Sequence, residues 1–154
     1  MMKSVEVRSL PDHVYAVEIS DSTHTLLSDE ELDAGGEDAG ITPFELLLGA
    51  LGSCMAITMR MYARRKAWPL VGVSIALTHD KVLARHCTEC TPEEIASAGP
   101  QGRIDVIHTD IGVSGELTAA QVARLHEIAG RCPVHRTLEA RPKFLSSIRH
   151  SPDQ

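Results

Sequence analysis

Residues 46–59 carry no charged side chain, and this run lies inside a longer stretch, residues 42–68, that is predicted to form one helix. Thr42 is a favourable N-cap, and Glu45 completes a capping box with it. Pro69 marks the end of the helix. A surface helix normally has one charged face, so an uncharged span of this length predicts a helix that is central and buried.

Short alternating apolar runs on both sides of this helix predict antiparallel strands. Three of them lie within residues 3–27, and two longer ones, at about 71–78 and 103–116, are expected to pair as a wide hairpin. A second helix begins at Thr118 with another capping box, and a last strand is expected over residues 144–148. The order of strands, long helix, strands, helix and strand is an α+β pattern.

The length and charge of the chain narrow the possible classes of protein. A chain of 154 residues is expected to form a single domain, residues 1–154. A formal net charge of -6 provides no basic face for phosphates, which argues against nucleic acid as a partner. The uncharged run is shorter than the roughly 20 residues that span a bilayer, and the N-terminus lacks a signal-peptide pattern. We therefore expect a cytoplasmic protein that does not cross a membrane.

The uncharged helix also predicts an oligomer. A helix without charge on any face needs cover on every side. Roughly three strands before it and three after it are too few to give that cover. A second copy of the chain is expected to supply the rest, in a homodimer.

Two cysteines are candidates for chemistry. Cys54 lies near the middle of the predicted helix, and Cys132 lies at another helix boundary, directly before Pro133. A cysteine in a buried helix is usually a small hydrophobic residue. Two such thiols are also able to meet in the fold and to cycle between dithiol and disulfide. The residues alone leave both interpretations open.

The segment TPFELLLGALGSCMAITMRMYARRKAWPL, together with IAGRCPVHRTLE, resembles the paired cysteine motifs of the OsmC/Ohr family of thiol-dependent peroxidases. The order of strands and helices is similar over nearly the whole chain. The resemblance implies the OsmC-like fold, in which a long central helix packs with antiparallel sheets in an intertwined homodimer. It also implies an active site at the subunit interface. The RMYARRKAWPL continuation is more similar to a general OsmC-like branch than to the organic hydroperoxide reductase branch.

The resemblance implies an activity as well, the reduction of organic hydroperoxides or hydrogen peroxide in oxidative-stress defence. Cys54 is then the thiol that attacks the peroxide, and Cys132 resolves the resulting sulfenic acid as a disulfide. A thiol reductant, such as a dithiol on a lipoylated protein, would regenerate the pair. No metal or other cofactor is expected.

A thiolate in the middle of a helix needs a nearby cation. The resemblance implies an arginine from the N-terminal strands, oriented by a glutamate ten residues before the attacking cysteine. Arg8 is the only arginine in those strands and is the candidate, although a lone arginine is most often an exposed surface charge. Phe44 occupies the place of the glutamate. Glu45 lies nine residues before Cys54, roughly on the opposite side of the helix, and is better explained by capping.

Phe44 at this place favours an alternative without catalysis. In that case the chain is an OsmC-fold protein that binds a small molecule or acts as a regulator, and it uses the apolar interfacial pocket without turnover. The two functions differ in whether Cys54 consumes peroxide.

A third alternative depends on Cys87 and Cys90, a C-x-x-C pair between the two long strands. This spacing suits zinc, a redox pair or a local disulfide. A structural zinc site needs four ligands, so it would require the hairpin to bring further ligands to the pair. The available histidines are His79, His86 and His108.

Overall fold

The computed structural model describes residues 4–99 and 101–150. The contacts within the chain divide it into two units, of which one comprises Met1–Gly52 and Ile75–Asp110 and the other Ser53–Ser74 and Ile111–Gln154. The boundary passes through the long helix and through both long strands. The single domain expected over residues 1–154 stays a prediction.

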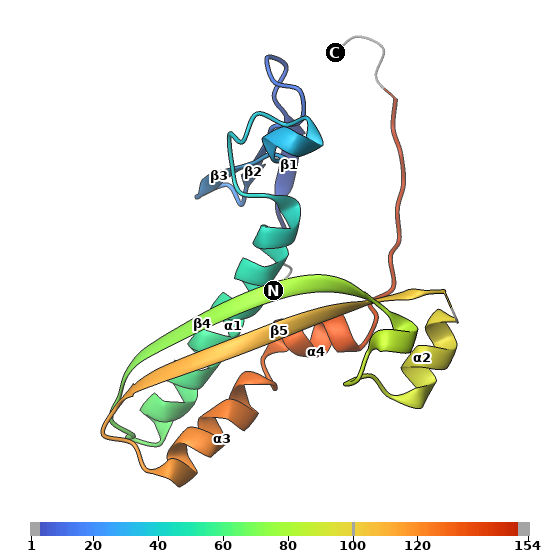
Figure 1. The fold of residues 1–154 in the computed structure, drawn as a ribbon. Coiled ribbons are helices and arrows are strands. Elements are labelled where there is room, and N and C mark those ends of the chain that lie inside the picture. The colour runs from blue at the N-terminus through green and yellow to red at the C-terminus, as the bar shows by residue number, and fades with distance from the viewer. Residues whose placement is uncertain (1–3, 100, 151–154) are drawn as a thin grey trace. The chain divides into compact units, whose positions relative to one another are not determined.

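Helices and antiparallel strands make up the α+β class of fold that was predicted (Figure 1). In chain order the elements are β1 (Glu6–Ser9), β2 (Val17–Ser20), β3 (Thr25–Ser28), the 3₁₀ helix η1 (Leu32–Ala34), α1 (Pro43–Arg65), β4 (Leu70–Leu83), the 3₁₀ helix η2 (Ala84–His86), α2 (Pro92–Ala98), β5 (Arg103–Gly115), α3 (Ala119–Ala129) and α4 (Pro133–Glu139).

The first three strands form one antiparallel sheet in the order β1-β2-β3. Val7 pairs with Ile19, and Ile19 pairs with Leu26, so apolar side chains from all three strands are in register. Directly opposed side chains on one face are the pairs that stabilise a sheet. The three short strands predicted from the alternation are confirmed.

The two long strands, β4 and β5, form a second sheet and lie side by side in Figure 1. A Cβ at Gly72 would lie 2.7 Å from the Ser114 hydroxyl, so these positions face each other near one end. Near the other end, the N–H of Ala84 donates to the carbonyl of Gly102 over 2.9 Å. Because the residue numbers rise on one strand as they fall on the other, the pair is antiparallel. The predicted wide hairpin is confirmed.

The long helix α1 begins with the capping box that the sequence predicts. The N–H and the hydroxyl of Thr42 donate to Glu45 Oε2 over 2.9 and 2.8 Å, and the N–H of Glu45 donates back to Thr42 Oγ1 over 3.3 Å. These bonds satisfy N–H groups that a helix start would otherwise leave without a partner.

The C-terminus of α1 comes earlier than predicted, at Arg65 rather than at Trp68. Ala67 has a φ of 53°, in the left-handed region. Its N–H donates to the carbonyl of Arg64, and the N–H of Trp68 donates to the carbonyl of Ala63. This pair of bonds is a Schellman motif, which ends a helix at a left-handed residue that is usually glycine.

Only one stripe of α1 is buried within the single chain. The buried side chains recur every four residues, as expected for one face of a helix. They are Leu51, Met55, Met59 and Ala63. Other apolar side chains of the helix are open to solvent, among them Ile57 and Met61, the latter 68% exposed. The other faces of the helix are open in the single chain, as expected if a second copy of the chain supplies their cover, and this homodimer stays a prediction.

By length and composition, α1 is also the one helix of the described residues that is apolar enough to cross a membrane. The core helix of a soluble protein meets the same criteria, so a single such helix is weak evidence. We infer no membrane span from it.

Two further expectations about the elements differ from the structure. The strand expected over residues 144–148 is wrong, because residues 141–150 have no regular secondary structure. Phe144 and Ile148 are 87% and 97% exposed, and no strand of the described chain pairs with this segment. Helix α2 was not predicted, although Thr91 and Glu94 form a capping box there that the sequence displays.

Candidate thiol site

Cys54 and Cys132 both belong to the second unit. Cys54 is half-buried in the middle of α1. Cys132 is completely buried and is the N-cap of α4, directly after the turn that ends α3. Leu125, Ile128 and Ala129 of α3 are buried in the same unit. One thiol is thus accessible in part, and the other is shielded from solvent.

The side chains of the two thiols interact. The pKa of Cys132 is raised, chiefly because burial disfavours the thiolate and further because Cys54 lies against it. The N–H of His135 donates to Cys132 Sγ over 3.4 Å, which opposes this rise without cancelling it. Burial and the neighbouring Cys54 side chain therefore both disfavour the thiolate form of Cys132.

Local hydrogen bonds hold the backbone on both sides of the thiol pair. The hydroxyl of Thr58, one turn after Cys54, donates to the carbonyl of Cys54 over 2.7 Å. The side chain of Cys132 accepts the N–H of His135 as an N-cap would. The ring of His135 lies instead 3.5 Å from the Glu139 carboxylate. Thr58 was not a sequence candidate, and its position four residues after Cys54 is the signal that would have found it.

An open cleft of about 800 Å³ lies in the same unit. Arginine side chains and apolar side chains line it together, and two of the lining residues, Arg131 and Pro133, flank Cys132 in the sequence. The residues are Thr58, Met61, Tyr62, Arg64, Arg65, Ile128, Arg131 and Pro133. A cleft of this volume and mixed lining suits an organic molecule with a polar or anionic group.

Tyr62, which lines the cleft, is held by two cations. The guanidinium groups of Arg65 and Arg124 lie 5.5 and 5.6 Å from the centre of its ring. Arg124 also donates to the Tyr62 hydroxyl over 3.3 Å, and this bond lowers the pKa of Tyr62. Trp68 meets the same ring edge-on, with 5.4 Å between ring centres.

Arg8, the predicted activating cation, lies on β1 in the first unit. Its side chain is 69% exposed and forms an ion pair of 2.9 Å with Glu6. An exposed pair of this kind contributes little to stability. Arg8 and Cys54 belong to different units. The catalytic role of Arg8 therefore stays a proposal.

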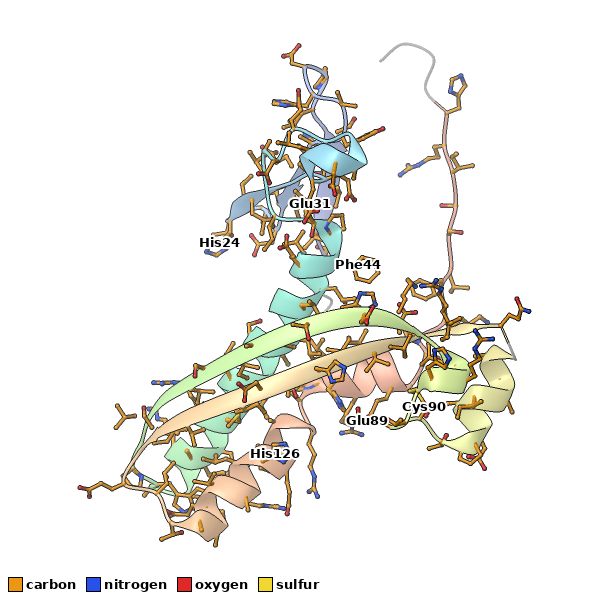
Figure 2. The ribbon with its side chains drawn as sticks, in the orientation of Figure 1. His24, Glu31, Phe44, Glu89, Cys90 and His126 are labelled. Carbon is orange, nitrogen blue, oxygen red and sulfur yellow. A yellow bond between two sulfur atoms is a disulfide. The ribbon has the colours of Figure 1, made fainter. Side chains whose placement is uncertain are left out.

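Phe44 has a partner in the first unit. Its ring, labelled in Figure 2, stacks on the ring of His79 in β4, and ring centres 4.5 Å apart with 17° between ring planes define this stack. His79 Nε2 lies 2.7 Å from Asp105 in β5, and Lys81 pairs with the same carboxylate. Lys81 and His79 together lower the pKa of Asp105. Phe44 thus stacks on a histidine that is itself held by an acid.

Cys87 and Cys90 form a disulfide. Among residues 4–99 and 101–150, no three His, Cys, Asp or Glu side chains gather as a metal site would require. His79, one of the histidines considered as a zinc ligand, is bound to Asp105 instead. Of the alternatives that the sequence left open for this pair, the structure contains the local disulfide.

These features define a class: an α+β protein in which a half-buried helical thiol contacts a buried thiol at the start of a later helix. The model of the OsmC-like protein family matches residues 35–146, a span that includes both cysteines. The chain belongs to the OsmC-like protein family. No curated protein matches the chain.

Solved structures with the same fold come from several bacteria. The OsmC-like protein of Mycoplasma pneumoniae has a TM-score of 0.67 and 15% sequence identity, over 92% of this chain and 89% of that one. An organic hydroperoxide resistance protein OsmC of Legionella pneumophila gives 0.61 and 18%, over 90% and 89%. The organic hydroperoxide resistance protein OhrB of Bacillus subtilis gives 0.59 and 13%, over 92% and 93%. At these identities the likeness establishes the fold.

Proposed function

We propose that this protein is a thiol-dependent peroxidase that reduces organic hydroperoxides, with Cys54 as the attacking thiol and Cys132 as the resolving thiol. The observation that carries the proposal is the interaction between these two side chains, which lie near enough for Cys54 to raise the pKa of Cys132. Two structural relatives named for organic hydroperoxide resistance support it. A peroxidase that resolves its sulfenic acid within one chain needs a second thiol within reach of the first.

The burial of the two thiols supports this assignment of roles. Cys54 is accessible in part, so a peroxide can approach it. Cys132 is completely buried and its pKa is raised, so it is a poor first nucleophile, because the thiolate is the reactive form. Cys132 acts after Cys54 has been oxidised, because it then needs to reach only the neighbouring sulfur of Cys54.

The proposed reaction begins when the Cys54 thiolate attacks the terminal oxygen of the hydroperoxide. The O–O bond breaks, Cys54 becomes a sulfenic acid, and the alkoxide takes up a proton and leaves as the alcohol. Cys132 then loses its proton and attacks the Cys54 sulfur, which releases water and forms the disulfide. An external dithiol exchanges with this disulfide and leaves as its own disulfide, restoring both thiols.

Thr58, which bonds to the Cys54 carbonyl, lines the cleft together with Arg131 and Pro133, which flank Cys132, although neither cysteine lines it. We propose this cleft as the site for the organic part of a hydroperoxide, which would make an organic hydroperoxide a better substrate than hydrogen peroxide. Met61, Ile128 and Pro133 offer apolar surface, and Arg131 offers a positive charge beside Cys132. Hydrogen peroxide would use none of this surface. The wider proposal keeps the expected homodimer and the cytoplasmic location, and Arg8 of either subunit remains the proposed activating cation.

A stopped-flow assay with an alkyl hydroperoxide and a dithiol reductant tests this function. The native protein should consume peroxide catalytically, and Cys54→Ser should fall to the uncatalysed rate. Catalytic consumption that survives in Cys54→Ser would overturn the proposal. Lys66→Gln, at an exposed position beyond the end of α1, is a control that should keep full activity.

The second candidate is an OsmC-fold binding or regulatory protein without turnover. The stack of Phe44 on His79 favours it, because this stack occupies the place where the family resemblance implies a glutamate. The same assay decides between the two. A native protein that binds an amphipathic anion in the arginine-lined cleft, but consumes no peroxide, would establish the second candidate.

A further inference from the structure

The disulfide between Cys87 and Cys90 lies in the excursion between β4 and β5, within the first unit. Cys87 follows η2, and Cys90 directly precedes Thr91, the N-cap of α2. Figure 2 shows Glu89 and Cys90 in the turn that leads into α2. The peroxide chemistry proposed for Cys54 does not use this pair.

The excursion is held in place by bonds other than the disulfide. The N–H of Ala84, a completely buried residue, donates to the carbonyl of Gly102 and closes the base of the excursion. The N–H of Cys87 donates to the carbonyl of Ala84. Thr91 and Glu94 form a complete capping box at the start of α2, and α2 contacts η2. None of these hydrogen bonds involves a cysteine sulfur.

A disulfide across C-x-x-C also restricts the unfolded chain little. The entropy that a crosslink removes grows with the length of the loop that it closes, and this loop is among the shortest possible. The Cα atoms of the two cysteines are 5.4 Å apart, within the usual range for a disulfide. The bond is therefore compatible with the fold without being required by it.

The pair is also open to a reagent from solvent. Both cysteines are half-buried, and His86, Thr88 and Glu89 around them are exposed. Arg85 and His86 precede the pair and are joined by a hydrogen bond from Arg85 Nε to His86 Nε2 over 3.3 Å. By contrast, Cys132 of the other pair is completely enclosed. An external thiol thus reaches the Cys87–Cys90 bond without any opening of the core.

We propose that Cys87 and Cys90 are a second redox centre of this protein, a thiol–disulfide exchange site that is reduced by small or protein-borne dithiols. The proposal is independent of peroxidase activity at Cys54. It rests on three properties of the disulfide. The two cysteines are partly accessible to solvent, and the loop that they close is very short. Hydrogen bonds that do not involve sulfur hold the same segment, so the fold does not depend on the disulfide.

The exchange balances in two steps. A thiolate of the dithiol attacks one sulfur of the disulfide, so that a mixed disulfide forms and the other cysteine leaves as a thiolate and takes up a proton. The second thiol of the reagent then attacks the mixed disulfide and forms the oxidised, cyclic reagent. The second cysteine is released as a thiol. Two electrons and two protons pass from the dithiol to the pair, and an oxidised dithiol reverses the sequence.

A dithiol is the chemical class that fits this site. Its second thiol completes the reduction within one complex, whereas a monothiol must wait for a second molecule. The exposed carboxylates of Glu89, Glu93 and Glu94 lie in the same turn and the first turn of α2. They repel anionic monothiols such as glutathione, so the site should prefer an uncharged dithiol such as dithiothreitol.

The Cys54→Ser/Cys132→Ser double variant tests the proposal, because it retains only Cys87 and Cys90. This protein is equilibrated in buffers of reduced and oxidised dithiothreitol, quenched in acid and treated with a maleimide that adds visible mass. Both thiols should become alkylated together in one two-electron transition, with the circular dichroism spectrum unchanged. At equal thiol concentration, dithiothreitol should reduce the pair faster than glutathione does.

Cys90→Ser in the same background should accumulate a mixed disulfide at Cys87 when it is offered an excess of a linear, uncharged disulfide such as hydroxyethyl disulfide, because the half that stays on Cys87 carries no second thiol to break the bond again. Mass spectrometry would detect this adduct. A bond that is reduced only when the circular dichroism spectrum is lost would overturn the proposal. So would thiols that remain reduced in an excess of hydroxyethyl disulfide. Because the double variant lacks the proposed peroxidase thiols, either result is independent of whether the native protein reduces peroxides.

Discussion

The side chain of Cys132 interacts with the side chain of Cys54, although one lies at the start of α4 and the other in the middle of α1. This contact brings together the two cysteines that the sequence motifs suggest as a pair. It also predicts what each thiol does when the other is removed.

One equivalent of an alkyl hydroperoxide should convert the native protein to the Cys54–Cys132 disulfide. Cys132→Ser should stop at the Cys54 sulfenic acid, because no thiol is left in contact with it. Peptide mass spectrometry distinguishes the two products, and a sulfenic-acid probe should label only the variant. Excess peroxide should then drive the variant on to sulfinic acid while the native protein is protected. Equal overoxidation of both proteins would contradict a resolving role for Cys132.

The raised pKa of Cys132 predicts a loss of stability at alkaline pH. An unfolded thiol has a pKa of about 8.5, and the folded value lies higher because the side chain is buried against Cys54. Above the unfolded value, the folded state retains a proton that the unfolded state has released. The free energy of unfolding therefore falls as pH rises, until the folded pKa is passed.

Urea unfolding of the reduced protein between neutral and alkaline pH measures this effect. The fall of the unfolding free energy with pH that is due to Cys132 should be absent in Cys132→Ser. It is obtained by subtracting the variant's curve from that of the native protein, so that the titrations of lysine and tyrosine cancel. Cys54→Ser should reduce the slope without removing it, because burial is the larger cause of the raised pKa. A native slope that Cys132→Ser leaves unchanged would contradict the assignment.

Glu45 provides a test of capping against catalysis. Its carboxylate accepts from the N–H and hydroxyl of Thr42, and these bonds lower its pKa. Its contribution to stability is thus present above the unfolded pKa and is lost as pH falls through the lower, folded value. Glu45→Gln keeps an acceptor and should retain peroxide turnover at neutral pH while removing this acid-dependent loss. A large drop in turnover would assign Glu45 a role beyond capping.

Thr42→Ala is the matched variant for the other half of the box. It removes the side-chain cap and should cost about 1 kcal/mol of stability. Thr42→Ser retains the hydroxyl and should cost much less. Thermal unfolding of both Thr42 variants and of Glu45→Gln separates the stability contributed by the Thr42 cap from that contributed by the Glu45 charge.

Local signals allowed most elements to be predicted from the sequence. The capping boxes at Thr42 and Thr118 start α1 and α3 as expected, and alternation located the strands of both sheets. Each of these signals depends on residues that are neighbours in the chain. The same reasoning, applied to Thr91, would have found α2.

Properties that depend on distant residues could not be predicted in this way. The contact of Cys54 with Cys132 joins two elements far apart in the chain, and only the family resemblance suggested it. The exposure of Met61 depends on how much surface the whole chain has available for covering α1. The alternation around Phe144 looked like a strand, but a strand also needs a partner to accept its hydrogen bonds.

Ala67 predicts a simple route to greater stability. It holds a left-handed conformation at the end of α1, where glycine carries no steric penalty. Ala67→Gly should therefore stabilise the protein by about 0.5 to 1 kcal/mol, since relief of strain exceeds the added entropy of the unfolded chain. Ala56→Gly, within the same helix, should instead destabilise by about 1 kcal/mol. Thermal unfolding that lowers the Tm in both variants would argue against the Schellman geometry.

The exposed apolar side chains of α1 predict the outcome of placing a charge among them. Ile57 is 57% exposed in the single chain and Met61 is 68% exposed, and the proposed homodimer would cover this face. Ile57→Glu would then bury an unpaired carboxylate in the interface, which is strongly unfavourable. It should convert a dimer to a folded monomer, as light scattering coupled to size exclusion and circular dichroism would measure. Lys66→Glu adds a negative charge beyond the helix end and should leave the dimer intact. If the native protein is monomeric even at high concentration, the homodimer is excluded. If Ile57→Glu is as dimeric as the native protein, the interface lies elsewhere.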